Sequence, residues 1–384
     1  MANRKSPNVS RRHRAYGGAY GSGTYAASGG SRRSRGTRKK PVLRRILETV
    51  AILACVLFVV GGGIWYYIAY APAIPEETVL YVPSKASYRQ VCDSLRKAGF
   101  VHDYRFDLVA KIRKYPYYVK PGRYILIKGA STSKVVDKLR SGAQDEVHLH
   151  FGRARSLRDL SAKIGRQIES DSAALMALFT QPVRLEAFSL FGAPLTYETA
   201  LGCFMPNTYY IHWNTTPEKF LSRMIYEQEN FWNDTRRAQA DALKLTPMEV
   251  ITLASIVELE TNKNDEKADI ASVYLNRLRR GIPLQADPTV KFAMGDPTLR
   301  RILKAHLKTD SPYNTYLYRG LPPGPICTPS AASVNAVLAN KKTSYYYFCA
   351  REDFSGYHAF AATLSEHNSN ARRYHRALNE RKIR

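Results

Sequence analysis

Acidic residues are missing from the first 45 positions, which carry 13 Lys or Arg. This segment alone supplies half of the formal net charge of +26, so the positive excess belongs largely to an N-terminal arm and not to the whole chain. The arm is rich in Gly, Ser and Tyr and shows no hydrophobic periodicity, which predicts that residues 1–45 are disordered. The other 339 positions contain ample apolar residues for folded cores, since 45% of the chain is hydrophobic. A wholly disordered protein is thereby excluded.

Cysteine is scarce, and its five residues are scattered. No CxxC pair and no Cys/His cluster has the spacing of a zinc site, so we expect neither a metal nor a cofactor. Four cysteines follow the segment discussed next, where disulfides are chemically possible, but their spacing gives no pairing; they are Cys92, Cys203, Cys327 and Cys349.

Charged residues are also absent from Val50–Tyr70, a run of 21 residues. As a helix this run would cross about 30 Å of hydrocarbon. We predict a transmembrane helix over residues 46–70, with Trp65 and three tyrosines as an aromatic belt at its far end. A cleaved signal peptide has a shorter apolar core and a small-residue cleavage site, and a buried core helix is the other alternative.

The positive charge before this helix predicts its orientation. By the positive-inside rule, residues 1–45 form a cytoplasmic arm and residues 71 onward lie outside the cytoplasm, which places the protein in the plasma (inner) membrane as a single-pass protein. A basic arm beside a membrane contacts anionic lipid. Nucleic-acid binding through the arm is the alternative, and we expect no nucleic-acid partner.

The segment of residues 76–151 has the pattern of a small α+β unit. Apolar residues recur with helical spacing after Tyr88, and Gly99 follows as a stop signal. Three short strands are predicted, over TVLYV, Gly122–Ile127 and EVHLHF. Residues 152–384 then read as longer helices interrupted by an irregular region between about 281 and 329, which is rich in Pro, Gly and Tyr.

One of these helices has a strongly marked start. Thr246, Pro247 and Glu249 form a capping box with proline at the first helical position, and the helix is predicted to run to about Thr261. Glu260 lies in phase with its apolar stripe, three residues after Val257. A carboxyl group held against apolar side chains has a raised pKa and is suited to donate a proton near neutral pH.

Glu258 is the neighbouring carboxyl group. It lies about 200° from Glu260 around the helix, so we expect it on another face and expect Glu258→Gln to be mild. If the helix frays before Glu260, that residue is instead solvated.

Five motifs occur in order along this part of the chain: LASIVELET, ASVYLNRL, LQADPTV, SPYNTY and GLPPGPI. Together they resemble the endolytic lytic transglycosylases of the MltG/YceG-like family. The resemblance implies a LysM-like subdomain over residues 76–151 and a larger, mainly helical α+β catalytic domain over residues 152–384. One departure occurs where the family reads FPDTY, since this chain has MPNTY with Asn207 in place of Asp.

The chemistry implied by the resemblance is non-hydrolytic cleavage of the bond between N-acetylmuramic acid (MurNAc) and N-acetylglucosamine (GlcNAc) in nascent peptidoglycan. A single carboxyl group protonates the leaving oxygen and then accepts a proton from the sugar's own 6-hydroxyl, which gives 1,6-anhydro-MurNAc ends and terminates glycan elongation. The family's catalytic residue is the Glu directly before the Thr or Ser of the first motif, which here is Glu260. A glycosidase normally needs two carboxyl groups.

The other motifs supply candidates for substrate contacts: Gln285, Asp287, Tyr313, Asn314, His358 and His367. Amides can bond hydroxyl and acetamido groups, and Tyr offers a face for a sugar ring. Each polar residue could instead stabilise an irregular loop. Asp287 could also act as a second carboxyl group, which would make the enzyme a hydrolase. A membrane-tethered peptidoglycan-binding scaffold without chemistry is a further alternative, and peptidoglycan synthases are the protein partners that the resemblance suggests.

Overall fold

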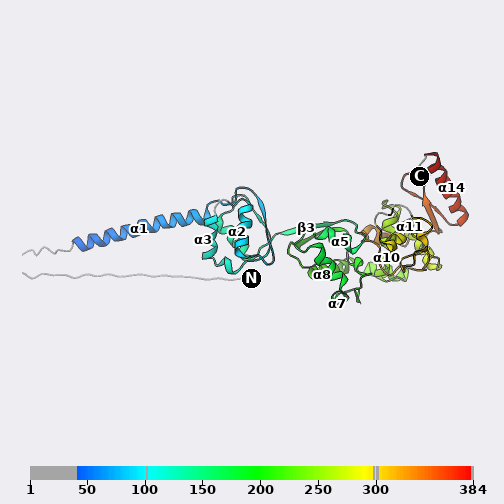
Figure 1. Cartoon of the computed structure of the whole chain (residues 1–384), viewed down its shortest axis with the longest axis horizontal. Coiled ribbons are helices and arrows are strands. Elements are labelled where there is room, and N and C mark those ends of the chain that lie inside the picture. The colour runs from blue at the N-terminus through cyan, green and yellow to red at the C-terminus, as the bar shows by residue number, and fades with distance from the viewer. Residues whose placement is uncertain (1–40, 101–102, 297–298, 300–301, 382–384) are drawn as a thin grey trace, which may run out of the picture. The chain divides into compact units, whose positions relative to one another are not determined.

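A computed structural model describes residues 41–100, 103–296, 299 and 302–381. Residues 1–40, to which nearly all of the basic arm belongs, lie outside the described residues. The chain divides into two compact units, Met1–Gly62 and Gly63–Arg384. Figure 1 shows the order of the elements along the chain.

Helix α1 covers Pro41–Tyr70 and begins five residues before the predicted start at residue 46. Within the described residues it is the one helix long and apolar enough to cross a membrane, over Val42–Tyr70, and its most apolar stretch is not buried by protein. A soluble core helix buries at least one face, so this alternative is disfavoured.

The small subdomain follows α1. Strands β1 (Thr78–Val82) and β2 (Gly122–Leu126) pair antiparallel, with Thr78 opposite Leu126. Between and after them lie α2 (Tyr88–Lys97), α3 (Asp103–Ile112), the short 3₁₀ helix η1 (Tyr115–Tyr117) and α4 (Thr132–Ser141). Their apolar faces form one core that extends from Ala69 to Leu139.

The strand predicted to end this subdomain packs elsewhere. Strand β3 (Glu146–Phe151) pairs antiparallel with β6 (Asn207–His212), and its Leu149 and Phe151 lie in a second core. Period-2 alternation identified the strand but could not show its partner, which lies about 60 residues away. The same core holds α5 (Leu157–Ile164), α6 (Ser172–Thr180), α7 (Pro182–Leu185), β4 (Ser189–Leu190), η2 (Ala200–Cys203) and α8 (Pro217–Phe231), while the exposed β5 (Ala193–Pro194) pairs with β4.

A third core surrounds α10 (Pro247–Glu260), which packs against α11 (Lys267–Arg279) and α13 (Ala331–Leu338). The predicted capping box is present, because Thr246 Oγ1 accepts from Glu249 N and the Glu249 carboxylate accepts from Thr246 N. The remaining elements are α9 (Asp234–Leu243), α12 (Asp287–Met294), η3 (His306–Lys308), β7 (Tyr347–Ala350), β8 (His358–Ala361) and α14 (Leu364–Glu380). The chain is thus a mixed helix and sheet protein with mainly helical packing around α10.

The five cysteines all lie among the described residues, and none of them forms a disulfide. Cys203 and Cys327 are buried, and burial raises the pKa of each thiol. They act as small apolar side chains of the core.

Candidate active site

Helix α10 brings Glu260 to the edge of the third core. Every residue from Val250 to Val257 is buried, so the helix is enclosed on all sides, and its last three residues are half-buried. Thr261 then adopts an extended conformation and ends the helix. Glu260 is therefore the last helical residue and does not fray into solvent.

Glu260 accepts a hydrogen bond from the Tyr274 hydroxyl on α11, with an oxygen–oxygen distance of 2.5 Å. Burial raises the pKa of Glu260 to about 7, and the negative charge of Asp287 acts in the same direction. The Tyr274 hydrogen bond and the charge of Lys291 oppose this rise. The prediction of a carboxyl group with a raised pKa at this position is thus confirmed by its surroundings, and near pH 7 Glu260 exists in both protonation states.

Two pockets meet at this carboxyl group, since Glu260 and Asp287 line both. One pocket has a volume of about 330 Å³ and an aromatic wall that includes Tyr316, Tyr346, Tyr347 and Phe348. The other has a volume of about 600 Å³ and carries basic side chains, namely Arg155, Arg158 and Lys291. A long substrate could therefore pass Glu260 with contacts on both sides.

Asp287 is the first residue of α12 and is exposed. Its Oδ1 accepts a hydrogen bond of 2.7 Å from the Tyr316 hydroxyl. Two tyrosine–carboxyl pairs therefore stand side by side in the site, Tyr274 with Glu260 and Tyr316 with Asp287. The first carboxyl group is enclosed by protein and the second is open.

Gln285 lines the aromatic pocket, and its backbone has a positive φ of 54°. Its Oε1 accepts a hydrogen bond from Arg277, and its backbone N donates to Thr315 O. Arg277 is itself buried and also donates to the carbonyl oxygens of Pro283, Leu284 and Tyr346. This arginine holds the loop that carries Gln285 in place.

The SPYNTY motif serves the loop more than the pockets. Asn314 is fully buried, and its amide donates to Leu307 O and Thr309 O while its Oδ1 accepts from Tyr316 N. Tyr313 lies against Phe292, with ring centroids 4.7 Å apart, and Phe292 lines the basic pocket. Neither Asn314 nor Tyr313 lines either pocket, whereas Tyr316, the last residue of the motif, lines the aromatic pocket.

The two candidate histidines occupy different surroundings. His367 lines the aromatic pocket and stacks on Tyr347, with centroids 5.4 Å apart. Burial and the charge of Arg277 lower its pKa. His358 instead pairs with the buried Glu266, since its Nδ1 lies 2.8 Å from Oε2 and its backbone N donates to Oε1. Only His367 lies within reach of a ligand in either pocket.

Asn207, the departure in the MPNTY segment, starts β6 opposite Phe151. Its Oδ1 accepts from Thr208 N at 2.8 Å, and it lines neither pocket at Glu260. Among the described residues, no group of three or more His, Cys, Asp or Glu side chains is arranged to hold a metal ion.

Glu258 lies on another face of α10 than Glu260, as expected, but that face is also covered by protein, so Glu258 is not exposed. Its Oε2 accepts from Lys267 Nζ at 3.0 Å, from Ser330 Oγ at 2.6 Å and from Ser333 Oγ at 2.5 Å. Burial alone would raise its pKa, but these hydrogen bonds and the Lys267 charge outweigh it and lower the pKa below 4.5. The helical phase could not show this cover, because α10 is enclosed on all sides and no face of it is free.

Several site residues were not selected from the sequence. Tyr274, Arg277 and Tyr316 all lie within the quoted motifs, but each reads as an ordinary core or loop residue. Arg155 and Arg158 lie more than 100 positions before Glu260, so only the fold brings them to the same pocket. A sequence signal existed for the first three, namely a polar residue inside a motif, whereas none existed for the two arginines.

We expect Glu258→Gln to be strongly destabilising. The change leaves Lys267, whose side chain is 4% exposed, without its buried counter-charge, and breaking a buried pair costs about 3 kcal/mol or more. Chemical unfolding of the full chain in detergent at pH 7 measures this loss. Glu186→Gln, at an exposed position, is the control and should change stability by less than about 0.5 kcal/mol. Equal stability of the two variants would contradict the role assigned to Glu258.

The pKa of Glu260 should move in opposite directions in two variants. Tyr274→Phe removes a donor that favours the charged form, so the pKa should rise above about 7. Asp287→Asn removes a negative charge that disfavours it, so the pKa should fall. Carbon-13 NMR titration of the Glu carboxyl groups, with the Glu260→Gln spectrum for assignment, reports both shifts. Tyr210→Phe on β6 is the control and should leave the titration unchanged.

Comparison with known proteins gives a consistent family. The model of the YceG-like family matches residues 80–373. An endolytic murein transglycosylase of Bacillus subtilis is 28% identical over 346 residues, which cover 84% of this chain and 93% of that protein. A protein of the same name from Streptococcus pneumoniae R6 is 27% identical over 70% of this chain, which spans about half (53%) of the pneumococcal protein.

A solved structure supports the same assignment. The crystal structure of a yceG-like protein from Listeria monocytogenes matches with a TM-score of 0.50 and 25% identity, over 77% of this chain and 98% of the other. Because the family model covers most of the sequence, including α10 and both pockets, the chain belongs to the YceG-like family.

Proposed function

We propose that this protein is an endolytic murein transglycosylase that cuts peptidoglycan glycan strands without water. The observation that carries the proposal is Glu260, a carboxyl group with a pKa of about 7 placed where two pockets meet. The relatives from Bacillus and Streptococcus that bear this activity in their names support it.

Glu260 is the proposed catalytic residue, and it acts twice. In the first step the protonated carboxyl gives its proton to the glycosidic oxygen, and the bond between that oxygen and C1 of MurNAc breaks. In the second step the carboxylate takes the proton of the 6-hydroxyl of the same sugar, while the oxygen of that hydroxyl forms a bond to C1. The proton count balances, and the product end is 1,6-anhydro-MurNAc. A pKa near the working pH serves both steps, because neither form of the group is costly to reach.

Tyr274 and Asp287 are proposed to set this balance. The Tyr274 hydroxyl stabilises the carboxylate after the first transfer, and the Asp287 charge favours the return of a proton to Glu260. Asp287 and Gln285 also line the pockets and are proposed to contact the saccharide, as is His367. Tyr313 acts through Phe292, while Asn314 and His358 hold the surrounding loops, so we leave these three out of direct substrate contact.

Pockets on both sides of Glu260 favour cleavage within a strand. The aromatic wall offers faces for sugar rings. The basic wall offers counter-charges for the carboxylates of the peptide attached to MurNAc. An enzyme that trims ends would need only one side to be open.

The remaining parts are assigned as follows. We propose that α1 anchors the protein in the inner membrane with residues 1–45 in the cytoplasm, since 13 basic residues precede the span and no acidic residue does. The subdomain of residues 76–151 is proposed as a LysM-like peptidoglycan-binding unit, and residues 152–384 as the catalytic domain. Peptidoglycan synthases are the proposed protein partners, because strands emerge from them at the same membrane.

Glu260→Gln should lower cleavage at least about 100-fold, because an amide can neither give nor accept the proton. The fold should be kept. The pKa of Glu260 in the folded protein, about 7, lies above the ordinary value of 4.5, so the folded protein loses stability as the pH rises between these two values. Gln does not titrate and therefore removes this loss. The melting temperature of the variant at pH 8 should therefore equal or exceed that of the parent. Activity is measured as soluble fragments released from sacculi by the full chain in detergent. Unchanged release would overturn the assignment.

The product distinguishes a transglycosylase from a hydrolase. Mass spectrometry after digestion in ¹⁸O-labelled water should find anhydro ends without the label in the parent enzyme. Asp287→Asn should shift the pH profile and slow the reaction but leave the products anhydro, because Asp287 supplies charge and contacts and not the attacking group. Labelled reducing ends that disappear with Asp287→Asn would show hydrolysis with Asp287 as the second carboxyl group.

A further inference from the structure

Helix α3 of the small subdomain is bound directly to the end of α1. Arg105, which is 1% exposed, donates to four backbone carbonyls, those of Tyr67, Ile68, Ala71 and Pro72. Its guanidinium also lies 5.0 Å from the centroid of the Tyr67 ring. The last carbonyls of a helix have no partner within it, so Arg105 supplies what α1 lacks at this end. Tyr67 and Ile68 at the end of α1, and Ala71 and Pro72 directly after it, belong to the same compact unit as α3.

This contact fixes the height of α3 relative to a membrane. The charge-free run that ends at Tyr70 has 21 residues and a helical length of about 30 Å, close to the thickness of the hydrocarbon layer. If α1 spans the bilayer, as proposed above, the carbonyls bound by Arg105 lie at its outer boundary. Helix α3 then lies at the level of the headgroups.

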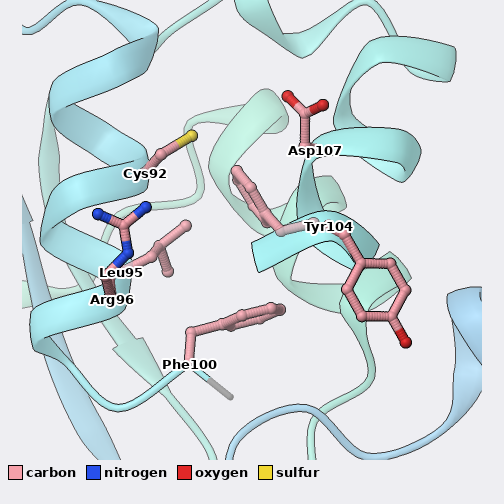
Figure 2. A pocket seen from close by; sticks show the side chains of 7 residues that line it. Cys92, Leu95, Arg96, Phe100, Tyr104 and Asp107 are labelled. Atoms are coloured by element: carbon pink, nitrogen blue, oxygen red, sulfur yellow. The ribbon is translucent and has the colours of Figure 1, made fainter. Parts of the chain in front are cut away.

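Beside Arg105, helix α3 carries a row of large side chains that the protein covers only in part. Tyr104, Leu108 and Ile112 are 60%, 41% and 58% exposed, and their spacing of four residues places them in one row. Ile112 follows Arg105 by two helical turns, so the row runs beside the residue that touches α1. Tyr104 lines a pocket together with Cys92 and Leu95 of α2, and Figure 2 shows its ring pointing away from these two residues.

The segment after α3 continues this surface with basic and aromatic residues. The stretch KIRKYPYYVK, residues 111–120, holds four Lys or Arg and no acidic residue. Tyr117 and Tyr118 are 84% and 52% exposed. Apolar side chains, exposed tyrosines and lysines together are the composition of surfaces that lie in the headgroup region of an anionic bilayer.

We propose that the row formed by Tyr104, Leu108 and Ile112, together with Tyr117 and Tyr118, inserts into the headgroup region of the bilayer that α1 crosses. This inference rests on the proposed anchoring through α1. The occupant of the surface is anionic phospholipid and not a second protein, because Arg105 of the same helix binds the residues at the outer end of the span and because Lys114 and Lys120 add positive charge beyond the Lys111–Asp107 and Arg113–Asp137 pairs. The small subdomain is thereby held against the membrane at two points and cannot swing about the end of α1.

Fluorescence quenching by brominated lipids tests the proposal in the full chain. The chain is placed, one copy per disc, in nanodiscs of phosphatidylcholine and phosphatidylglycerol at a ratio of 3:1, with bromine on the acyl chains near the headgroup. Ile112→Trp and Tyr104→Trp are the reporters, each in a Trp65→Phe background, and the signal of the Trp65→Phe chain, which keeps Trp213 and Trp232, is subtracted from each. Both positions are exposed, so the reporters should not disturb the fold.

Lys85→Trp in the same background is the matched control. Lys85 is exposed, and it follows Ser84, whose backbone N donates to Glu169. Both residues come after the end of β1, and the strand is about 17 Å long, so Lys85 is separated by that length from the start of β1, which follows α1. The bromine-dependent quenching at the two reporter positions should be at least twofold greater than at the control. Quenching equal to that of the control would overturn the proposal. Reporters that are shielded from the aqueous solvent only in discs with two copies of the chain would also overturn it, because a second copy would then be the occupant.

The test separates failure of this inference from failure of the anchoring. Insertion of α1 is reported by the quenching of Trp65, which is the difference in quenching between the parent chain and the Trp65→Phe chain. If Trp65 is quenched and the reporters on α3 are not, the anchor stands and the membrane contact of α3 is refuted. If Trp65 is not quenched, both are refuted.

Discussion

The enclosure of α10 on all sides is the constraint from which the site follows. A helix with eight consecutive buried residues leaves little solvent around the half-buried carboxyl groups that follow them. Each of its last two glutamates must therefore be neutralised, bonded or protonated. Glu258 is fully bonded to Lys267, Ser330 and Ser333, and stays charged. Glu260 has one donor, Tyr274, and its pKa rises instead. The two carboxyl groups therefore differ in pKa because side chains donate three hydrogen bonds to Glu258 and one to Glu260.

The same constraint explains why one carboxyl group can serve as acid and then as base. The carboxyl group of Asp287, by contrast, is exposed to solvent and accepts a hydrogen bond from Tyr316. Enclosure brings the two forms of Glu260 close in free energy, and its position as the last residue of a helix adds to this, because the carbonyl end of a helix disfavours negative charge. The rest of α10 serves to keep this one residue enclosed yet in contact with two pockets.

The sequence was informative where a local rule decides the outcome. Thr246 and Glu249 specify a helix start whatever packs around it, and the charge-free run before Tyr70 specifies a long apolar helix by its composition. The position of Glu260 followed from the helix start and from the motif. Phase alone was incomplete, since it separated Glu258 from Glu260 correctly but could not show that protein covers both faces. The sequence also did not predict the partner of β3, because its alternating pattern is compatible with pairing to any strand of similar length, and only the fold shows that the partner is β6.

The polar residues of the motifs show why site residues are harder to predict than the fold. Asn314 and Gln285 belong to neighbouring loops and have the same chemical groups, yet one amide is buried in its own loop and the other lines a pocket. An irregular loop beside an active site must bond its own backbone before it can present any side chain to a ligand. Arg277 and Asn314 meet that requirement here with seven hydrogen bonds between them. A motif around a catalytic residue therefore mixes residues that meet the substrate with residues that hold the loop, and only the direction of each side chain separates the two.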